Sequence, residues 1–167
     1  MLDVNNIPKL SHLSLKNKLG LTVYPWKNCK PRFSAKLIKP LSECNVAIVS
    51  SAGLYVKGEQ EKFDYKIKGG DFSYRIIPNN ISMELLYDSH RSQTFDHSGI
   101  RSNPSTGMPI PQLTELVNSG LIGSLNHQHI SLMGAITAPG RFIKQSIQPI
   151  VHILIADKVD VVLFVPI

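Results

Sequence analysis

The side chains best suited to binding a small charged molecule alternate within one short segment. Asp71, Ser73 and Arg75 are each two residues apart, around a β-rich stretch at 73–77. On a strand such residues share one face of the sheet. A guanidinium on that face could bind a substrate carboxylate through two parallel hydrogen bonds. The alternative is a surface arginine paired with Asp71, and the residues alone leave both interpretations open.

A second group of titratable side chains lies in a polar segment. Residues 88–109 are rich in Ser, Asp, His, Gly and Pro, and they predict a long loop of the kind that is often functional. His90, Asp96 and His97 in this loop could orient an amine or deliver a proton near neutral pH. The alternative for each is an ordinary solvated or capping residue.

Two histidines, His127 and His129, are spaced to share one face of a strand predicted at 127–132. This spacing permits a metal pair, but no third ligand has a convincing spacing. We therefore predict no metal site and favour packing and hydrogen bonding for both. His129 also remains a candidate contact for a substrate.

Two further places could bind an anion. Ser50, Ser51 and Gly53 follow a predicted strand at 45–50, where carboxylate or phosphate sites occur, although the same residue types also make ordinary tight turns. Thr137 precedes a predicted helix. It could offer free N–H groups to an anion or simply cap that helix.

The hydrophobic pattern predicts a scaffold in which strands alternate with helices. Apolar runs without alternation at 45–50 and 161–165 are typical of parallel strands buried on both faces. One helix is expected to start at Pro111, and a later one, capped near Thr137, should be kinked by Pro149. The predicted fold class is α/β, with three layers, a mostly parallel sheet and a Rossmann-like or flavodoxin-like order.

The sequence stops where such a sheet places its chemistry. Ligands of open α/β sheets bind outside the carboxyl ends of the strands, and Pro166 and Ile167 directly follow a strand that we expect to be central. No helix follows to cover the sheet, so the fold is expected to be incomplete at this end. The alternative is a small domain with this strand at its edge.

The composition is that of one folded domain. Among 167 residues, 43% are hydrophobic and 18% are charged. This composition predicts neither a disordered chain nor a membrane protein. The first residues lack the pattern of a signal peptide, and the longest apolar runs are too short to span a bilayer. Cys29 and Cys44 form no metal or redox motif. We expect a cytoplasmic protein without membrane contact.

The net charge of +6 is concentrated near the start of the chain. Residues 1–40 hold eight of the 18 basic residues, one of the 12 acids and four prolines. They predict a basic arm packed on an α/β domain of residues 41–167. Few aromatic residues accompany these lysines, so nucleic acid is not the expected partner. A solvated arm is favoured over contact with an acidic partner.

Several uncommon segments follow one another in the predicted domain. They are VAIVSSAGLY at 46–55, GDFSYRIIP at 70–78, HRS at 90–92, FDHSG at 95–99, IGSLN at 122–126 and SLMGAITAPGR at 131–141. In this order they resemble the glycine/sarcosine/betaine/D-proline reductase selenoprotein B family, over roughly residues 40–167. Motifs in one shared order are more specific than any motif alone.

The resemblance implies a reductase component that cleaves a C–N bond in glycine, sarcosine, betaine, D-proline or a related amine. It implies that a selenocysteine or cysteine directly follows Ile167 and attacks the α-carbon of the substrate. It also implies a partner subunit, with a pyruvoyl group in some members, and reducing equivalents from thiols or a selenoprotein. No cofactor is expected in this chain, and self-association stays open.

The implied nucleophile is absent from the 167 residues, so the chain as given is not expected to catalyse. A UGA codon read as a stop would end the sequence at this place, and a shortened gene would look the same. The alternative is a non-catalytic module that binds a small molecule or a partner. A hydrolase with a metal held by histidines is a third hypothesis, which metal analysis of the purified protein would test.

Overall fold

The structure, a computed structural model, describes residues 14–23, 35–92, 95 and 97–167. The chain divides into two compact units, Met1–Lys36 and Leu37–Ile167. The described part of the first unit contains α1 (Leu15–Val23), in which Leu15, Leu19 and Val23 are exposed. Most of the expected basic arm lies outside the described residues.

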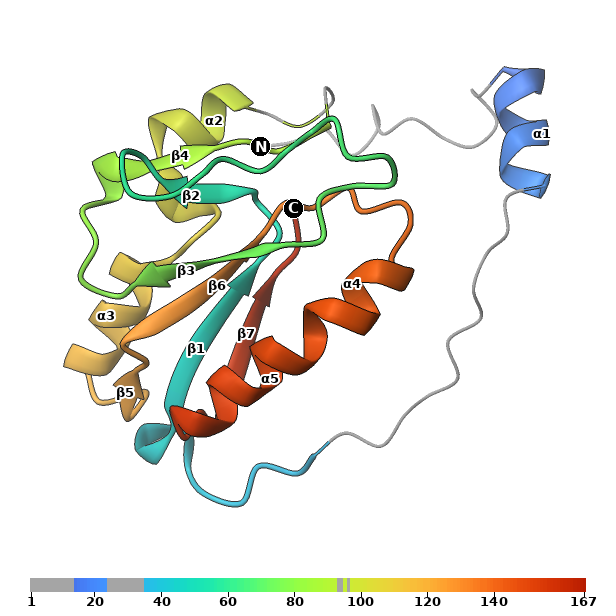
Figure 1. Ribbon diagram of the computed structural model, residues 1–167. Helices are drawn as coiled ribbons and strands as arrows, with labels where there is room; N and C mark the ends of the chain where they lie inside the picture. Colours follow the sequence, from blue (N-terminus) through green and yellow to red (C-terminus); the bar gives the residue numbers. More distant parts are fainter. Residues whose placement is uncertain (1–13, 24–34, 93–94, 96) are drawn as a thin grey trace. The chain divides into compact units, whose positions relative to one another are not determined.

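The second unit is built on a curled, mostly parallel sheet (Figure 1). Its central strand is β1 (Asn45–Ser50), and β7 (Val161–Val165) pairs with it in parallel along one edge. Two short parallel strands, β5 (Ser124–Leu125) and β6 (Gln128–Leu132), pair with β1 at its start and its end. A strand has two edges and β7 occupies one, so β5 and β6 share the other. β3 (Tyr74–Pro78) runs antiparallel to β6.

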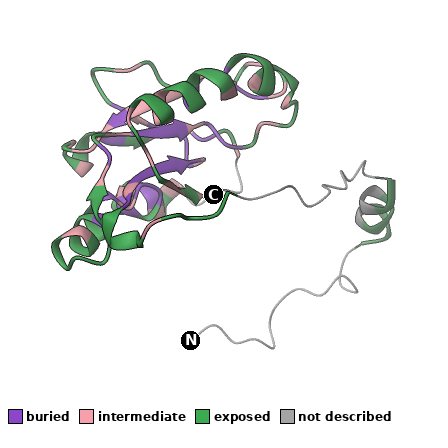
Figure 2. Ribbon diagram, turned by 90° about the horizontal axis from the view of Figure 1, so that it is seen from below, coloured by how far each residue is buried: buried purple, intermediate pink, exposed green. Residues whose placement is uncertain are grey.

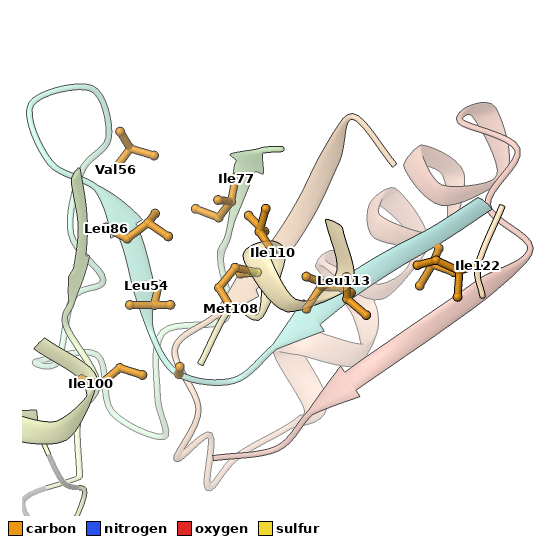
Figure 3. Close-up of a cluster of buried hydrophobic side chains, with 12 residues drawn as sticks. Leu54, Val56, Ile77, Leu86, Ile100, Met108, Ile110, Leu113 and Ile122 are labelled. Carbon is orange, nitrogen blue, oxygen red and sulfur yellow. The ribbon is translucent and has the colours of Figure 1, made fainter. Parts of the chain in front are cut away.

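One face of β1 packs against a helix. α3 (Ile110–Asn118) buries Ile110 and Leu113 in a cluster that includes Val46 and Ile48 of β1. The η3 turn (Leu41–Glu43) precedes β1. Side chains of the smaller elements described below join the same cluster, as Figure 3 shows. This cluster is the larger of the two apolar cores.

The opposite face of the sheet packs against a second pair of helices. α4 (Gly140–Gln145) and α5 (Ile147–Ala156) follow β6, and Ile150 of α5 contacts a cluster with Val49 of β1 and Ile130 of β6. Neighbouring residues of a strand point to opposite faces, so β1 can contribute to both cores. In Figure 2 the buried strands accordingly lie between the exposed outer surfaces of the helices.

A small antiparallel sheet lies beside the main one. β2 (Leu54–Val56) pairs with β4 (Leu86–Asp88), and the short helical turn η4 (Met83–Leu85) precedes β4. α2 (His97–Ser102) and the turn η5 (Pro104–Thr106) follow. The prediction of a continuous loop at residues 88–109 was therefore wrong, because part of that segment is helical.

The two helices after β6 also differ from expectation. The predicted single helix is broken at Ser146, whose hydroxyl donates to the carbonyl oxygen of Phe72. Pro149 lies in the first turn of α5. Backbone N–H groups of the first turn have no acceptor within the helix, so the lack of an N–H in Pro149 breaks no hydrogen bond and causes no kink. α4 begins at Gly140 after Pro139, and no side chain caps it. The suggestion that Thr137 caps this helix was wrong.

Within the described residues β7 is an edge strand, where we expected a central one, because it pairs only with β1. Its Phe164 is 69% exposed, and Ile155 of α5 is 68% exposed. An α/β fold with a mostly parallel sheet and few helices is confirmed. The Rossmann-like or flavodoxin-like three-layer arrangement stays a prediction. Among the described residues no helix is long and apolar enough to cross a bilayer.

Candidate functional site

The order of the strands places a crevice at the carboxyl ends of β1 and β7. After β1 the chain forms β6 on one edge of that strand and then, through α4 and α5, β7 on the other. In parallel sheets such a reversal leaves a crevice outside the strand ends, and ligands bind there. A hollow of about 150 Å³ lies at this place, and residues of β1, β6 and β7 line it. We call it the strand-end hollow.

Ser51, at this hollow, ties the end of β7 to the end of β1. Its backbone N–H donates to the carbonyl oxygen of Val165 at 3.1 Å. The N–H of Ile167 donates to Ser51 Oγ at 2.9 Å, and Ser51 Oγ lies 3.3 Å from the carbonyl oxygen of Ile167. The backbone that leaves β7 is therefore fixed beside Ser51.

The other two residues predicted here shape the turn after β1. Ser50 is fully buried, and its Oγ accepts a hydrogen bond from the N–H of Ala52 at 3.1 Å. Gly53 has a φ of +68°, and a Cβ at this position would lie 2.9 Å from backbone atoms of His90. Any other residue would push His90 away. The tight turn is thus seen, and the binding of an anion at this place stays a prediction.

His90 is buried behind this turn, with an exposed fraction of 8%. Its Nδ1 accepts a hydrogen bond from the N–H of Ser92 at 3.1 Å, so the neutral ring carries its proton on Nε2. Burial, and then repulsion by the nearby His97, lower the pKa of His90, although Asp88 opposes this effect. The imidazole is therefore neutral at physiological pH.

His97 belongs to a charged cluster on α2 and β4. Its Nδ1 contacts a carboxylate oxygen of Asp88, and its Nε2 lies 3.0 Å from the carbonyl oxygen of Ser92. Arg101 Nε donates to the other oxygen of Asp88 at 2.6 Å. The Asp88 side chain is 1% exposed, so it needs these partners. Both nitrogens of His97 thus face oxygen atoms of the fold.

This cluster borders a cavity of about 560 Å³ that we call the polar cavity. Its lining combines cationic side chains with aromatic rings around the buried carboxylate. The residues are Tyr55, Lys62, Phe63, Tyr65, Tyr87, Asp88, Ser89, His90, Arg91, His97 and Arg101. Cations can bind a carboxylate, and aromatic faces can bind an ammonium group. The lining therefore suits a small zwitterion.

The predicted face of Asp71, Ser73 and Arg75 is arranged differently. β3 begins at Tyr74, so Asp71 and Ser73 precede the strand and the expectation of one shared strand face was wrong. Asp71 accepts hydrogen bonds from Ser73 and from the N–H of Asp64, and Ser73 Oγ accepts from Arg75 at 2.9 Å.

Arg75 is engaged by the loop as well as by Ser73. Its Nε donates to the carbonyl oxygen of Glu61 at 2.6 Å, and Nη2 lies 3.3 Å from the carbonyl oxygen of Lys62. The guanidinium also lies over the ring of Phe63, 4.3 Å from the centroid. These contacts attach the loop before β3 to the sheet.

His129 is fully buried, and both of its ring nitrogens are used within the fold. Nδ1 accepts from the backbone N–H of Ile48 at 3.2 Å, and Nε2 lies 3.3 Å from Asn79 Oδ1. No group of three metal-ligating side chains is found among the described residues.

Two predicted residues remain, Thr137 and Asp96. Thr137 is exposed and lines neither the polar cavity nor the strand-end hollow. Asp96 lies outside the described residues. Sequence reasoning missed Asp88, Arg91 and Arg101, which need the pairing of β2 with β4 to become neighbours of a cavity. The signal available was Asp88 at the end of a short apolar run.

Comparison with known proteins agrees with the expected family. The family model of glycine/sarcosine/betaine reductase selenoprotein B matches residues 14–166. D-proline reductase subunit gamma of Acetoanaerobium sticklandii is 29% identical over 125 residues, which cover 75% of this chain and 49% of that protein. The chain thus spans about half the length of this relative. No solved structure matches. The family match covers nearly the whole chain, so the chain belongs to the glycine/sarcosine/betaine reductase selenoprotein B family.

Proposed function

We propose that this chain forms the substrate-binding part of a selenoprotein B-type reductase component. The observation that carries the proposal is the polar cavity, with its cationic and aromatic lining, in a member of this family. The substrate would be glycine, sarcosine, betaine, D-proline or a related amine. The name of the relative, a subunit of D-proline reductase, supports a component that works with partner subunits.

The lining of the polar cavity explains how such a substrate would be held. Lys62 and Arg91 make no ion pair with a described acidic residue, so both can bind a carboxylate. Tyr55 and Tyr87 are directly opposite each other on β2 and β4, and both line the cavity. Their rings would offer aromatic surface to an amine or its methyl groups. Asp88 is already neutralised by His97 and Arg101.

The reacting group in this proposal is a selenolate or thiolate on the residue that follows Ile167. It attacks the α-carbon, and the C–N bond breaks as the amine leaves with the electron pair and takes up a proton. A thiol or selenol of a partner then attacks the chalcogen, so the carbon leaves with a proton and a dichalcogenide forms. Ser51 holds Ile167 beside the strand ends, where backbone N–H groups can stabilise such an anion.

Binding to the polar cavity can be tested on this chain with Arg91→Gln. We expect at least one of D-proline, glycine, sarcosine and betaine to bind the parent chain, and the variant to bind it about tenfold more weakly, since a hydrogen bond to a charged group is worth ~1.5–3 kcal/mol. Lys144→Gln, on the exposed surface of α4, removes the same charge and should bind as the parent does. Isothermal titration calorimetry gives the dissociation constants. Failure of all four compounds to bind the parent would overturn the proposed pocket.

The position of the nucleophile can be tested on the gene. We expect the codon after that of Ile167 to be TGA, or a cysteine codon in a longer transcript, with an open frame and a further cysteine codon beyond it. Sequencing the gene and its transcript decides this. A TAA or TAG codon without an open frame would refute the reductase proposal and favour the non-catalytic binding module.

A further inference from the structure

The imidazole of His90 carries a hydrogen-bond donor that the described fold does not use. Nδ1 is occupied by the N–H of Ser92, which leaves the proton of the neutral ring on Nε2. That atom is buried and has no hydrogen-bond partner among the described residues. A buried N–H without a partner destabilises the fold, so this one requires a physical explanation.

The position of Nε2 supplies that explanation. A Cβ on Gly134 would lie 2.5 Å from His90 Nε2 and 2.4 Å from the carbonyl oxygen of Ser51. The imidazole nitrogen and the Ser51 carbonyl oxygen thus border the same small space beside Gly134, a residue with a φ of +68° and no side chain to fill that space. Ser51 is also the residue that holds Ile167.

His90 therefore lies between the two hollows of the candidate site. The residue lines the polar cavity, whereas Ser51, also beside Gly134, lines the strand-end hollow. The ring is kept in place by Phe95, whose centroid is 4.4 Å away, and by the backbone of Gly53. These contacts fix the direction of the N–H at Nε2 before any acceptor is bound.

We propose that His90 donates a hydrogen bond from Nε2 to the anionic atom held at the carboxyl ends of β1 and β7. In the proposed reductase this atom is the chalcogen of the residue that follows Ile167, so the inference rests on the proposed function and adds a catalytic residue to it. The hydrogen bond favours the selenolate or thiolate over its protonated form. No electron or proton is transferred to or from His90 in this step.

The test places a thiol where the proposal needs one. The full chain is extended after Ile167 by Cys-Gly, and the rate of alkylation by iodoacetamide is followed against pH. After tryptic digestion the added cysteine lies in the peptide that starts at Val159, apart from Cys29 and Cys44. His90→Leu removes the donor, and His90→Gln keeps an N–H near the position of Nε2.

We expect His90→Leu to raise the pKa of the added thiol and to slow its alkylation at pH 7 about tenfold, which corresponds to about one pKa unit. His90→Gln should stay within about threefold of the parent, because an amide N–H replaces the imidazole N–H. His152→Leu, on the exposed surface of α5, should leave the rate unchanged. Equal thiol titration in the parent and in folded His90→Leu overturns the proposal.

A second measurement covers the case in which His90→Leu does not fold. In the parent chain with the added cysteine, the ¹⁵N signal of His90 Nε2 should shift as the thiol ionises, and it should not shift in the chain without that cysteine. A ¹⁵N shift that does not change as the thiol ionises also overturns the proposal. Neither result depends on substrate binding, whereas a parent chain that binds none of the four amines refutes the proposed pocket and leaves the thiol titration intact.

Discussion

Replacing His129 by alanine is expected to destabilise the folded chain by about 3–5 kcal/mol, as buried large-to-small substitutions with a lost hydrogen bond do. The ring is fully buried, and it accepts the backbone N–H of Ile48 in the middle of β1. β5 ends and β6 begins beside this point, so His129 replaces a strand partner that the sheet does not provide. Urea unfolding measures the loss.

His127 is the matched control, two residues away. Its side chain is 71% exposed, and its contact with Asp157 is a long 3.9 Å, so His127→Ala should change stability by less than ~0.5 kcal/mol. A loss as large as that of His129→Ala would mean that burial and the bond to Ile48 do not explain the effect at His129. A small effect at both positions would show that the bond to Ile48 adds little.

The same histidine should make stability depend on pH. Burial, and then repulsion by His127, lower the pKa of His129 to about 4 in the folded chain, whereas the unfolded value is roughly 6.5. Above pH 6.5 the ring is neutral in both states. Below pH 6.5 the imidazole of His129 is protonated in the unfolded chain but stays neutral in the folded chain. The free energy of unfolding therefore falls by about 3 kcal/mol between pH 6.5 and 4.

A comparison of the parent with His129→Ala isolates the contribution of His129 to the pH dependence of the unfolding free energy. His90 also has a lowered pKa, but it is present in both chains and its contribution cancels. The difference in unfolding free energy between the two chains should therefore shrink as the pH falls toward 4. Parallel pH profiles would contradict the assignment of a buried neutral ring.

The sequence predicts the main strands because burial on both faces leaves a visible trace. The apolar run of β1 is of this kind, whereas β7 shows the same kind of run without being buried. The start and end of α3 follow from Pro111 and Gly120, which has a φ of +71°. The short strands β2 and β4 span three residues each, too few to show a period of two. The edge position of β7 depends on long-range pairing, which local patterns do not contain.

The candidate site is predictable to a similar extent. Ser50 and Ser51 follow from the rule for strand ends, and His90 from its place in a polar segment. That His90 and Ser51 border the same space beside Gly134 depends on contacts between distant parts of the chain. For His129 the sequence favours packing and hydrogen bonding over a metal and leaves a substrate contact open, because strand spacing shows only which face a side chain takes. It does not show that a backbone N–H of β1 needs a partner there.

Replacing Asp71 by alanine should cost about 3 kcal/mol of stability, because it leaves buried donors without an acceptor. The carboxylate is 5% exposed. It accepts from the N–H of Asp64 and the N–H of Ser73 at 2.8 Å each, and from Ser73 Oγ at 2.6 Å. Ser73 in turn contacts Arg75, so the loop before β3 should loosen as a unit. Thermal and urea unfolding report the loss, and hydrogen exchange locates it.

Asp64→Ala is the matched control, because Asp64 is exposed and accepts one backbone N–H, that of Lys66. It should lower the free energy of unfolding by only ~0.5 kcal/mol, as most surface substitutions do.

The dependence of stability on pH below neutrality gives an independent check of the role of Asp71. Burial would raise the pKa of Asp71, but hydrogen bonds from Ser73 and Asp64 outweigh it and lower the pKa. The unfolded carboxyl therefore binds a proton first as the pH falls, so this part of the stability is present above about pH 4 and lost below it. If Asp71 instead mainly held a substrate, Asp71→Ala would unfold like the parent and lose only ligand affinity.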